Sequence, residues 1–141
     1  MRKYQTSVAF VVALAVSLSA ALVAEAAEFL SVEGTVQVMS STENEWKTAA
    51  KGSNVDVGDT IRTARRSSAD IALDPEKKNT IRITEKTLIV LNSDSAEQID
   101  RVNLARGRIY SNMENIKEGL SFEVTTPSAV AGVRGSSYMV Y

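Results

Sequence analysis

From residue 29 onward, apolar and polar residues alternate in short runs separated by Gly, Pro, Asn and Asp. A period of two is typical of strands with one buried face, and no run keeps the 3.6-residue period of an amphipathic helix. There are about ten or eleven such runs, and turn signals recur about every eight to twelve residues. The pattern therefore predicts an all-β fold with little helix, arranged as a sandwich, a roll or a short solenoid.

The expected strands lie in segments 29–39, 54–63, 69–73, 80–84, 87–91, 98–104, 108–111 and 120–125, and in the apolar end of the chain. Glycines interrupt two of these segments. We expect a bulge at Gly34, and a tight bend between two strands at Gly58 and Asp59. An apolar-x-apolar pattern recurs at 61–63, 69–73, 81–83 and 88–90, and it slightly favours a roll.

The alternation also predicts which side chains face the core. Inward positions are expected at Val32, Gly34, Val36, Val38, Val55, Val57, Ile61, Ala69, Ile71, Leu73, Ile81 and Ile83. Arg82 lies between two of them and is expected to face solvent. Trp46, the single tryptophan, is expected to anchor the core or its rim because indole side chains bury a large area; a binding platform is the alternative.

The first 26 residues have a different pattern. Arg2 and Lys3 precede an almost uncharged run at 7–23, and Ala24 and Ala26 place small residues at the −3 and −1 positions of a cleavage site. This order predicts a secretory signal peptide at 1–26, followed by one β domain at 27–141. The alternative is an uncleaved membrane anchor. The run is rich in Ala and Ser and no basic cluster follows it, which favours cleavage.

Composition narrows the partners and the compartment. Cleavage would leave 115 of the 141 residues and shift the net charge from −1 to −2, because Arg2, Lys3 and Glu25 are removed. No basic stripe is visible along the sequence, so neither nucleic acid nor a polybasic membrane contact is expected. An exported chain without cysteine is expected in the periplasm or elsewhere in the cell envelope, or secreted, and not among disulfide-rich extracellular modules.

Catalysis is not expected. The chain has no histidine and no cysteine, which removes the Ser-His-Asp and Cys-His arrangements and the usual zinc ligand sets. Ser136 lacks a nucleophile elbow and a nameable base. Asp94 and Glu97 match no ordered calcium cage, and the remaining carboxylates fall in turns or on outward positions. We therefore expect no enzyme activity, cofactor or metal.

The apolar end of the chain, 125–141, contains an unusual arginine. Arg134 lies between Gly132 and Gly135 in a segment expected to form two short strands paired as a hairpin. Glycine permits positive φ and close backbone approach, and Thr126-Pro127 suits a strand end. We expect Arg134 to form a buried bidentate pair with Asp59 or Asp56; the alternative is that Arg134 contacts a partner.

These motifs resemble those of a known family. The turn Gly58-Asp-Thr-Ile-Arg-Thr63, the run Ser67–Leu73 and the end Phe122–Ser136 are together similar to the FecR domain, the periplasmic part of a bacterial iron-citrate regulator. The resemblance extends back to Val32–Val38 and Trp46. The signature residues that it implies are Gly58, Asp59, Thr63, Thr126, Pro127, Gly132, Arg134 and Gly135.

The sequence departs from that family in three ways. A longer turn at 74–79 replaces a usual Asp-Gly turn, and Ser136 replaces a usual threonine. Only six residues precede the hydrophobic run at 7–23, so the cytoplasmic sigma-regulating segment of such regulators is not expected.

The resemblance implies a binding role. We expect a non-catalytic protein–protein interaction or signalling module of the envelope, which uses strand edges or the region of Tyr110, Tyr138 and Tyr141 to contact an envelope protein. The alternative is a structural or polysaccharide-binding module, against which the 6% aromatic content counts.

Overall fold

The computed structural model describes residues 27–93, 99–114, 116, 121–133 and 137–140, and within these ranges the chain forms strands and no helix. The all-β prediction is confirmed. The strands are β1 (Ala27–Glu33), β2 (Val36–Met39), β3 (Trp46–Thr48), β4 (Asn54–Val55), β5 (Thr60–Thr63), β6 (Ser68–Ala72), β7 (Asn79–Ile83), β8 (Leu88–Asn92), β9 (Arg101–Arg106), β10 (Ile109–Met113), β11 (Phe122–Thr125), β12 (Val130–Val133) and β13 (Ser137–Val140). In this part of the chain, no helical segment is able to cross a membrane.

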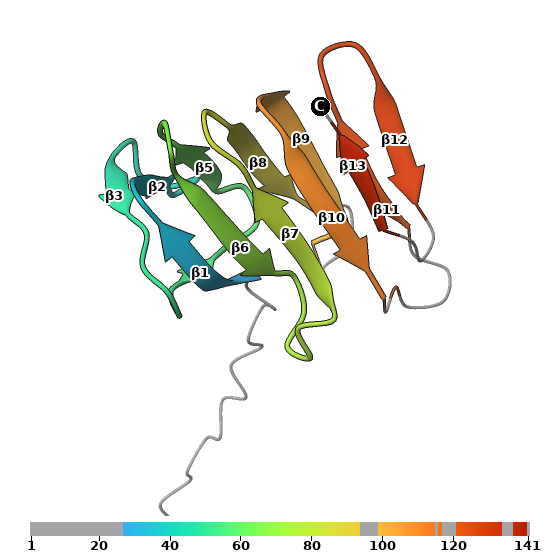
Figure 1. Cartoon of the computed structure of the whole chain (residues 1–141), viewed down its shortest axis with the longest axis horizontal. Helices are drawn as coiled ribbons and strands as arrows, with labels where there is room; N and C mark the ends of the chain where they lie inside the picture. Colours follow the sequence, from blue (N-terminus) through green and yellow to red (C-terminus); the bar gives the residue numbers. More distant parts are fainter. Residues whose placement is uncertain (1–26, 94–98, 115, 117–120, 134–136, 141) are drawn as a thin grey trace, which may run out of the picture.

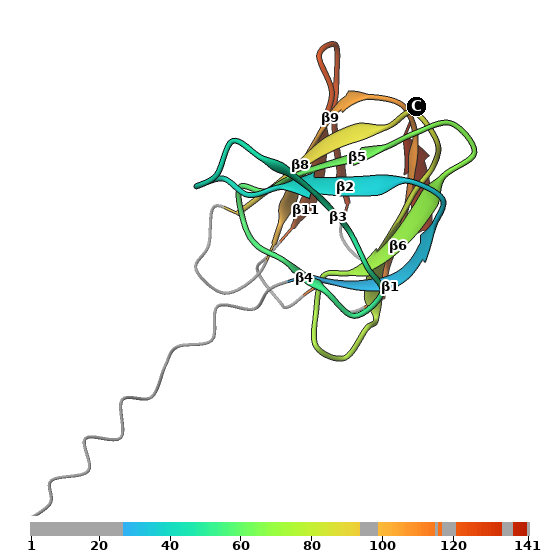
Figure 2. The same ribbon diagram turned by 90° about the vertical axis from the view of Figure 1, so that its left-hand side faces the viewer.

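The strands form two sheets that close into a roll (Figures 1 and 2). The six-stranded sheet has the order β13-β10-β7-β6-β1-β4, and the seven-stranded sheet has the order β12-β11-β9-β8-β5-β2-β3. Among the strand pairs, β9 and β11 are parallel and the others are antiparallel. The chain passes from one sheet to the other after β3, β4, β10 and β12, and it makes four further crossings after β1, β5, β7 and β9.

These four crossings stack against one another along one edge of the roll, at the top in Figure 1. We call them the corner ridge, made of residues 33–35, 64–67, 84–87 and 106–108. Hydrogen bonds link each corner to the next: Thr35 N–H to Ser67 Oγ (2.9 Å), Lys86 N–H to the Ala64 carbonyl (3.1 Å), and Arg108 N–H to Thr87 Oγ1 (3.0 Å). One residue with positive φ turns each corner: Gly34, Arg66, Lys86 and Gly107.

The core lies between the sheets and is rich in isoleucine, whose branched side chain suits a pleated surface. The largest fully buried side chains are Phe29, Val36, Val55, Ile61, Ile71, Ile81, Ile83, Ile89, Leu91, Val102, Ile109 and Val124. Ala69, Ile71, Leu73, Ile81 and Ile83 are buried as predicted, and Arg82 is exposed between the last two.

Two predictions about strands are wrong. Segment 29–39 is two strands in different sheets, so Gly34 turns a corner, and the bulge lies between Phe29 and Ser31. The side chain of Val57 is 45% exposed because it lies in the turn between β4 and β5. In β8, for which the sequence pattern assigned no face, the buried residues are Ile89 and Leu91.

The predicted C-terminal hairpin is also wrong. β12 pairs with β11 in the seven-stranded sheet, whereas β13 pairs with β10 in the six-stranded sheet. The last two strands therefore extend two different layers, as β1 and β2 do at the start of the fold.

Candidate functional site

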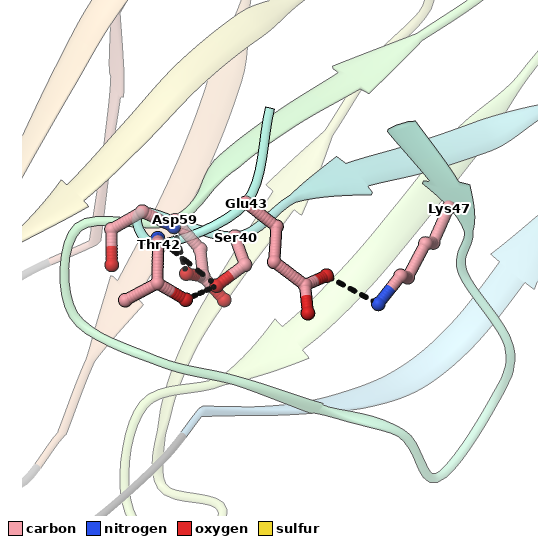
Figure 3. A network of polar contacts seen from close by, with 6 residues as sticks. Ser40, Thr42, Glu43, Lys47 and Asp59 are labelled. Atoms are coloured by element: carbon pink, nitrogen blue, oxygen red, sulfur yellow. Dashed lines mark hydrogen bonds and ion pairs between the residues drawn. The ribbon is translucent and has the colours of Figure 1, made fainter. Parts of the chain in front are cut away.

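The first signature motif is a turn held together by a buried carboxylate. Asp59 is only 5% exposed, and its Oδ1 and Oδ2 accept the backbone N–H groups of Ser41 and Asp56, each at 3.0 Å (Figure 3). The Asp59 carboxylate thus joins the β2–β3 connection to the turn before β5. Nearby on the surface, Glu43 and Lys47 form an exposed ion pair (Figure 3).

Gly58 is required in this turn by both conformation and space. Its φ is +91°, and a Cβ built on it would lie 2.9 Å from Cβ of Ser41. Its N–H donates to the Leu91 carbonyl at 2.7 Å, which fastens the turn to β8. Thr63 ends the motif and is 6% exposed; its hydroxyl donates to the Thr84 carbonyl (2.5 Å) and accepts the N–H of Thr87 (3.0 Å). Gly58, Asp59 and Thr63 therefore stabilise the fold by linking this turn to neighbouring strands and turns.

The second signature motif forms the β11–β12 loop. Thr126 N–H donates to the Ala129 carbonyl at 2.7 Å, and the Thr126 hydroxyl accepts the Ala129 N–H at 3.0 Å. Pro127 is exposed in this loop, just past the end of β11, as its missing N–H leads one to expect. Gly132 has no positive φ, and the nearest atom to a Cβ built on it is Glu123 Cγ at 3.9 Å. The expectation of close approach at Gly132 is therefore wrong.

The structure does not bring the two described motifs together. In the seven-stranded sheet, β11, β9 and β8 lie between β12 and β5. Arg134 and Gly135 fall outside the described residues, so the predicted pair of Arg134 with Asp59 or Asp56 stays a prediction. Both carboxylate oxygens of Asp59 already have backbone partners, so the role of Asp59 in its turn does not depend on Arg134.

β12 is the least protected edge strand among those whose side chains are described. It spans four residues without a charge, Val-Ala-Gly-Val, and the Val130 side chain is 66% exposed. At the opposite edge of the same sheet, β3 has three residues, including Lys47. β4, an edge of the other sheet, has two residues. Short length and lysine are common protections of edges, and β12 has neither.

A row of side chains crosses the outer face of the seven-stranded sheet and ends at β12. Cross-strand pairing connects Trp46, Met39, Thr60, Val90, Asn103, Thr125 and Val130, one residue from each strand, and we call this the outer row. Trp46 is half-buried and lies under Arg62, whose Cζ is 3.9 Å from the ring centroid. Trp46 thus lies on the outer face under Arg62 and is not part of the described hydrophobic core. Periodicity alone did not reveal the row, because it depends on strand register.

Two open depressions, of about 430 and 550 Å³, lie on the surface of the described residues. The one of about 550 Å³ lies beside β12. It is lined by Asn92, Ser93, Arg101, Asn103, Glu123, Thr125 and Val130. Arg101 Nε donates to Glu123 Oε2 at 3.3 Å across its floor. In the part of the chain that the structure describes, no three acidic side chains gather to hold a metal ion. This face therefore has a polar floor and an apolar side chain, Val130, at its edge.

The three tyrosines proposed as a contact region do not share a cross-strand pair. Tyr110 is 36% exposed on β10 and pairs with Met139, whereas Tyr138 pairs with the buried Ser111. Tyr141 is outside the described residues. The register therefore does not support a common tyrosine surface.

An ion pair crosses the outer face of the six-stranded sheet. Arg82 donates to both carboxylate oxygens of Asp70, at 2.7 and 2.9 Å, and the Ser31 hydroxyl donates to Oδ2 at 2.8 Å. The hydrogen bond from Arg82 lowers the pKa of Asp70, helped by Ser31 and opposed by partial burial. The stabilisation is therefore present above the ordinary carboxyl pKa and is lost as pH falls through the lowered pKa. The pair is exposed enough to contribute at most about 1 kcal/mol.

The corner ridge has a concentration of positive charge that is not visible along the sequence. It carries Arg65, Arg66, Lys86, Arg106 and Arg108, all exposed, and the acidic residues Glu33 and Glu85. The chain as a whole has a net charge of −1. The basic stripe that the sequence seemed to lack is thus assembled by the fold from three separate corners.

Comparison with known proteins gives one family. A family model described as FecR protein matches residues 59–141, which include the second signature motif and all of the first except Gly58. The matched range begins at Asp59, so the similarity that we noted at Val32–Val38 and Trp46 lies outside it. No curated protein and no solved structure matches the chain.

Proposed function

This chain belongs to the FecR protein family, and from that premise we propose that it is an exported, non-catalytic binding module of the cell envelope. Its partner is an envelope protein that adds a strand to the free edge of β12. The role is one of interaction or signalling, in keeping with the regulatory character of the family.

The observation that carries this proposal is the outer edge of β12, along which no other described strand is paired. A free edge offers a row of backbone donors and acceptors, and an added strand gains main-chain hydrogen bonds there. Val130, 66% exposed, supplies an apolar side chain at the point where the outer row reaches the edge. The depression lined by Asn103, Glu123 and Thr125 offers polar contacts to the side chains of the added strand.

The absence of histidine and cysteine from the sequence supports the non-catalytic part of the proposal. Export is supported by the layout of residues 1–26. The alternative, a structural or polysaccharide-binding module that stacks sugars on aromatic rings, has less support, because Trp46 is half-buried beneath Arg62 and Tyr110 is only 36% exposed.

The test places a photo-crosslinking amino acid at position 130 in the producing cell, followed by mass spectrometry of the crosslinked species. We expect one envelope protein to be captured, with its crosslinked segment extended and apolar at alternate positions. A Val130→Lys substitution is expected to abolish the complex, because it places a charge on the edge that the partner strand must cover.

Val57 provides the matched control. It is an exposed valine (45%) in a turn and not on an edge strand. We therefore expect Val57→Lys to leave the complex unchanged, and a crosslinker at position 57 to capture no partner. Equal capture from both positions, or an undiminished complex in the Val130→Lys variant, would contradict the proposal.

A further inference from the structure

We propose that the corner ridge is a second binding surface, which takes a linear anionic polysaccharide bearing a carboxylate or phosphate on its repeating units. This inference shares only the envelope location with the proposed function. It concerns a different edge of the roll from β12 and different residues, so each proposal can fail without the other.

Four of the five cations of the ridge are open to a ligand in the part of the chain that the structure describes. Arg65, Arg66, Lys86 and Arg106 are exposed, and none of the four forms an ion pair with a described residue. Elsewhere on the surface, exposed cations such as Lys77 are paired with carboxylates.

The acidic residues of the ridge serve its scaffold. Oε2 of Glu85 accepts the backbone N–H of Arg66 at 2.6 Å, which links the second corner to the third. Oε2 of Glu33 accepts the Ser68 hydroxyl at 3.2 Å. Both carboxylates keep their charge, and with five cations and two anions the ridge has a net charge of +3.

The backbone gives a second, independent indication. Arg66 and Lys86 have φ values of 53° and 54°, a conformation that is strained for any residue with a Cβ. The equivalent positions of the other two corners are Gly34 and Gly107, which adopt positive φ without that strain. Lys77 in the β6–β7 loop shares this conformation, so what distinguishes Arg66 and Lys86 is that they occupy equivalent corners of the ridge.

The geometry of the ridge favours a charged chain. The corners follow one another at the spacing of neighbouring strands, about 4.8 Å, so the cations lie in a line. An open depression of about 430 Å³, lined by Thr84, Glu85, Lys86, Gly107 and Arg108, interrupts this line and offers room for one charged unit.

Other anionic partners fit this edge less well. The N–H groups of Thr35, Arg66, Lys86 and Arg108 are already bonded within the ridge, so a peptide cannot add a strand there. A membrane surface is a plane and is matched better by a broad patch than by one line of cations. No aromatic residue lies in the four corners, so recognition there is by charge and not by sugar stacking.

The experiment measures binding of the full-length chain, purified as the cell processes it, to polygalacturonate and to neutral dextran. We expect binding to polygalacturonate alone, weakening as salt rises because the screening length falls from about 10 Å at 0.1 M to about 3 Å at 1 M. The double variant Arg66→Gly with Lys86→Gly is expected to lose at least about tenfold in affinity, since each cation near an anionic surface contributes appreciably. The same variant is expected to melt at an equal or higher temperature, which separates lost binding from lost folding.

Lys77→Gly is the matched control. Lys77 is also an exposed cation with positive φ (58°), but it lies in the β6–β7 loop and pairs with Glu28. We expect it to leave binding unchanged. The proposal is overturned if the double variant binds as the unmodified chain does, if Lys77→Gly weakens binding equally, or if polyglutamate or anionic phosphatidylglycerol vesicles bind more tightly than polygalacturonate.

Discussion

Gly107 and Gly132 show that two glycines of the same chain can have opposite requirements. Gly107 has a φ of +97°, and a Cβ built there would lie 2.2 Å from Thr87 Oγ1 and 2.5 Å from Thr87 Cα. The second atom belongs to the backbone and cannot move away. Gly132 lies in a strand without positive φ, and a Cβ built there would make only an ordinary contact with Glu123 Cγ at 3.9 Å. The motif that contains Gly132 therefore does not need glycine for the fold of β12.

These environments predict opposite effects of the same substitution. Gly107→Ala is expected to lower the free energy of unfolding by about 2–4 kcal/mol, through backbone strain and overpacking against Thr87. Gly132→Ala is expected to leave it unchanged or raise it by up to about 1 kcal/mol, because alanine loses less conformational entropy in a strand. Urea unfolding of both variants measures the difference. A similar loss in both would show that Gly132 has a constraint beyond its described surroundings.

Single-residue burial was predictable where a strand keeps its alternation from end to end. Ile81 and Ile83 were placed correctly for that reason. Val57 was misplaced because the turn that removes it from the sheet begins only two residues after β4 starts. In β8 four apolar residues are consecutive, so alternation could not decide between Leu88 with Val90 and Ile89 with Leu91.

At the scale of elements, the turn at Asp59 is hydrogen-bonded to the β2–β3 connection and to β8, which are distant from it in the sequence. Asp59→Asn is expected to cost about 1–3 kcal/mol of stability. Each carboxylate oxygen now accepts one backbone N–H, from Ser41 or from Asp56. In asparagine one oxygen is replaced by an NH₂ group, which cannot accept, so one of the two hydrogen bonds is lost. Thermal unfolding at neutral pH measures this loss.

Asp56 offers a close control for that substitution. Its side chain is exposed and makes no hydrogen bond to a described residue, while its backbone N–H remains available to Asp59. Asp56→Asn is therefore expected to be neutral within about 0.5 kcal/mol. Equal destabilisation by the two variants would mean that local charge, and not the buried pair of hydrogen bonds, holds the turn.

Elements were predictable as strands but not as members of a particular sheet. The run 29–39 alternates across Gly34, yet β1 and β2 lie in different layers. Alternation reports only that one face is buried, and a corner of the roll preserves burial while it changes the layer. The same limit explains why β12 and β13 were expected to pair. It also hid the corner ridge, whose cations come from three corners between positions 65 and 108.

For the whole molecule, the predicted signal peptide has a consequence at the first strand. Cleavage after Ala26 would leave Ala27, the first residue of β1, as the new terminus, and no described strand would be shortened. We expect the mature protein recovered from the envelope to begin at Ala27, as measured by intact mass and N-terminal sequencing.

Two substitutions near the predicted cleavage point test this. Ala26→Leu is expected to block processing, because the −1 position requires a small residue. Glu25→Leu changes the −2 position and is expected to be processed normally. A mature terminus elsewhere, or a chain that keeps residues 1–26, would place the boundary of the β domain differently.

The pairing of β1 also sets the order in which the fold can be built. Its neighbours are β4 and β6, and the hydrogen bond between Ser31 and Asp70 joins residues 39 positions apart. A chain that appears amino end first therefore leaves Phe29 without its cross-strand partner Ile71 until β6 has followed. Folds dominated by such distant pairings form slowly, on the order of milliseconds to seconds. The first strand of this protein is therefore unpaired until its partner strands have emerged, and during that interval its apolar residues are open to binding by other proteins of the compartment.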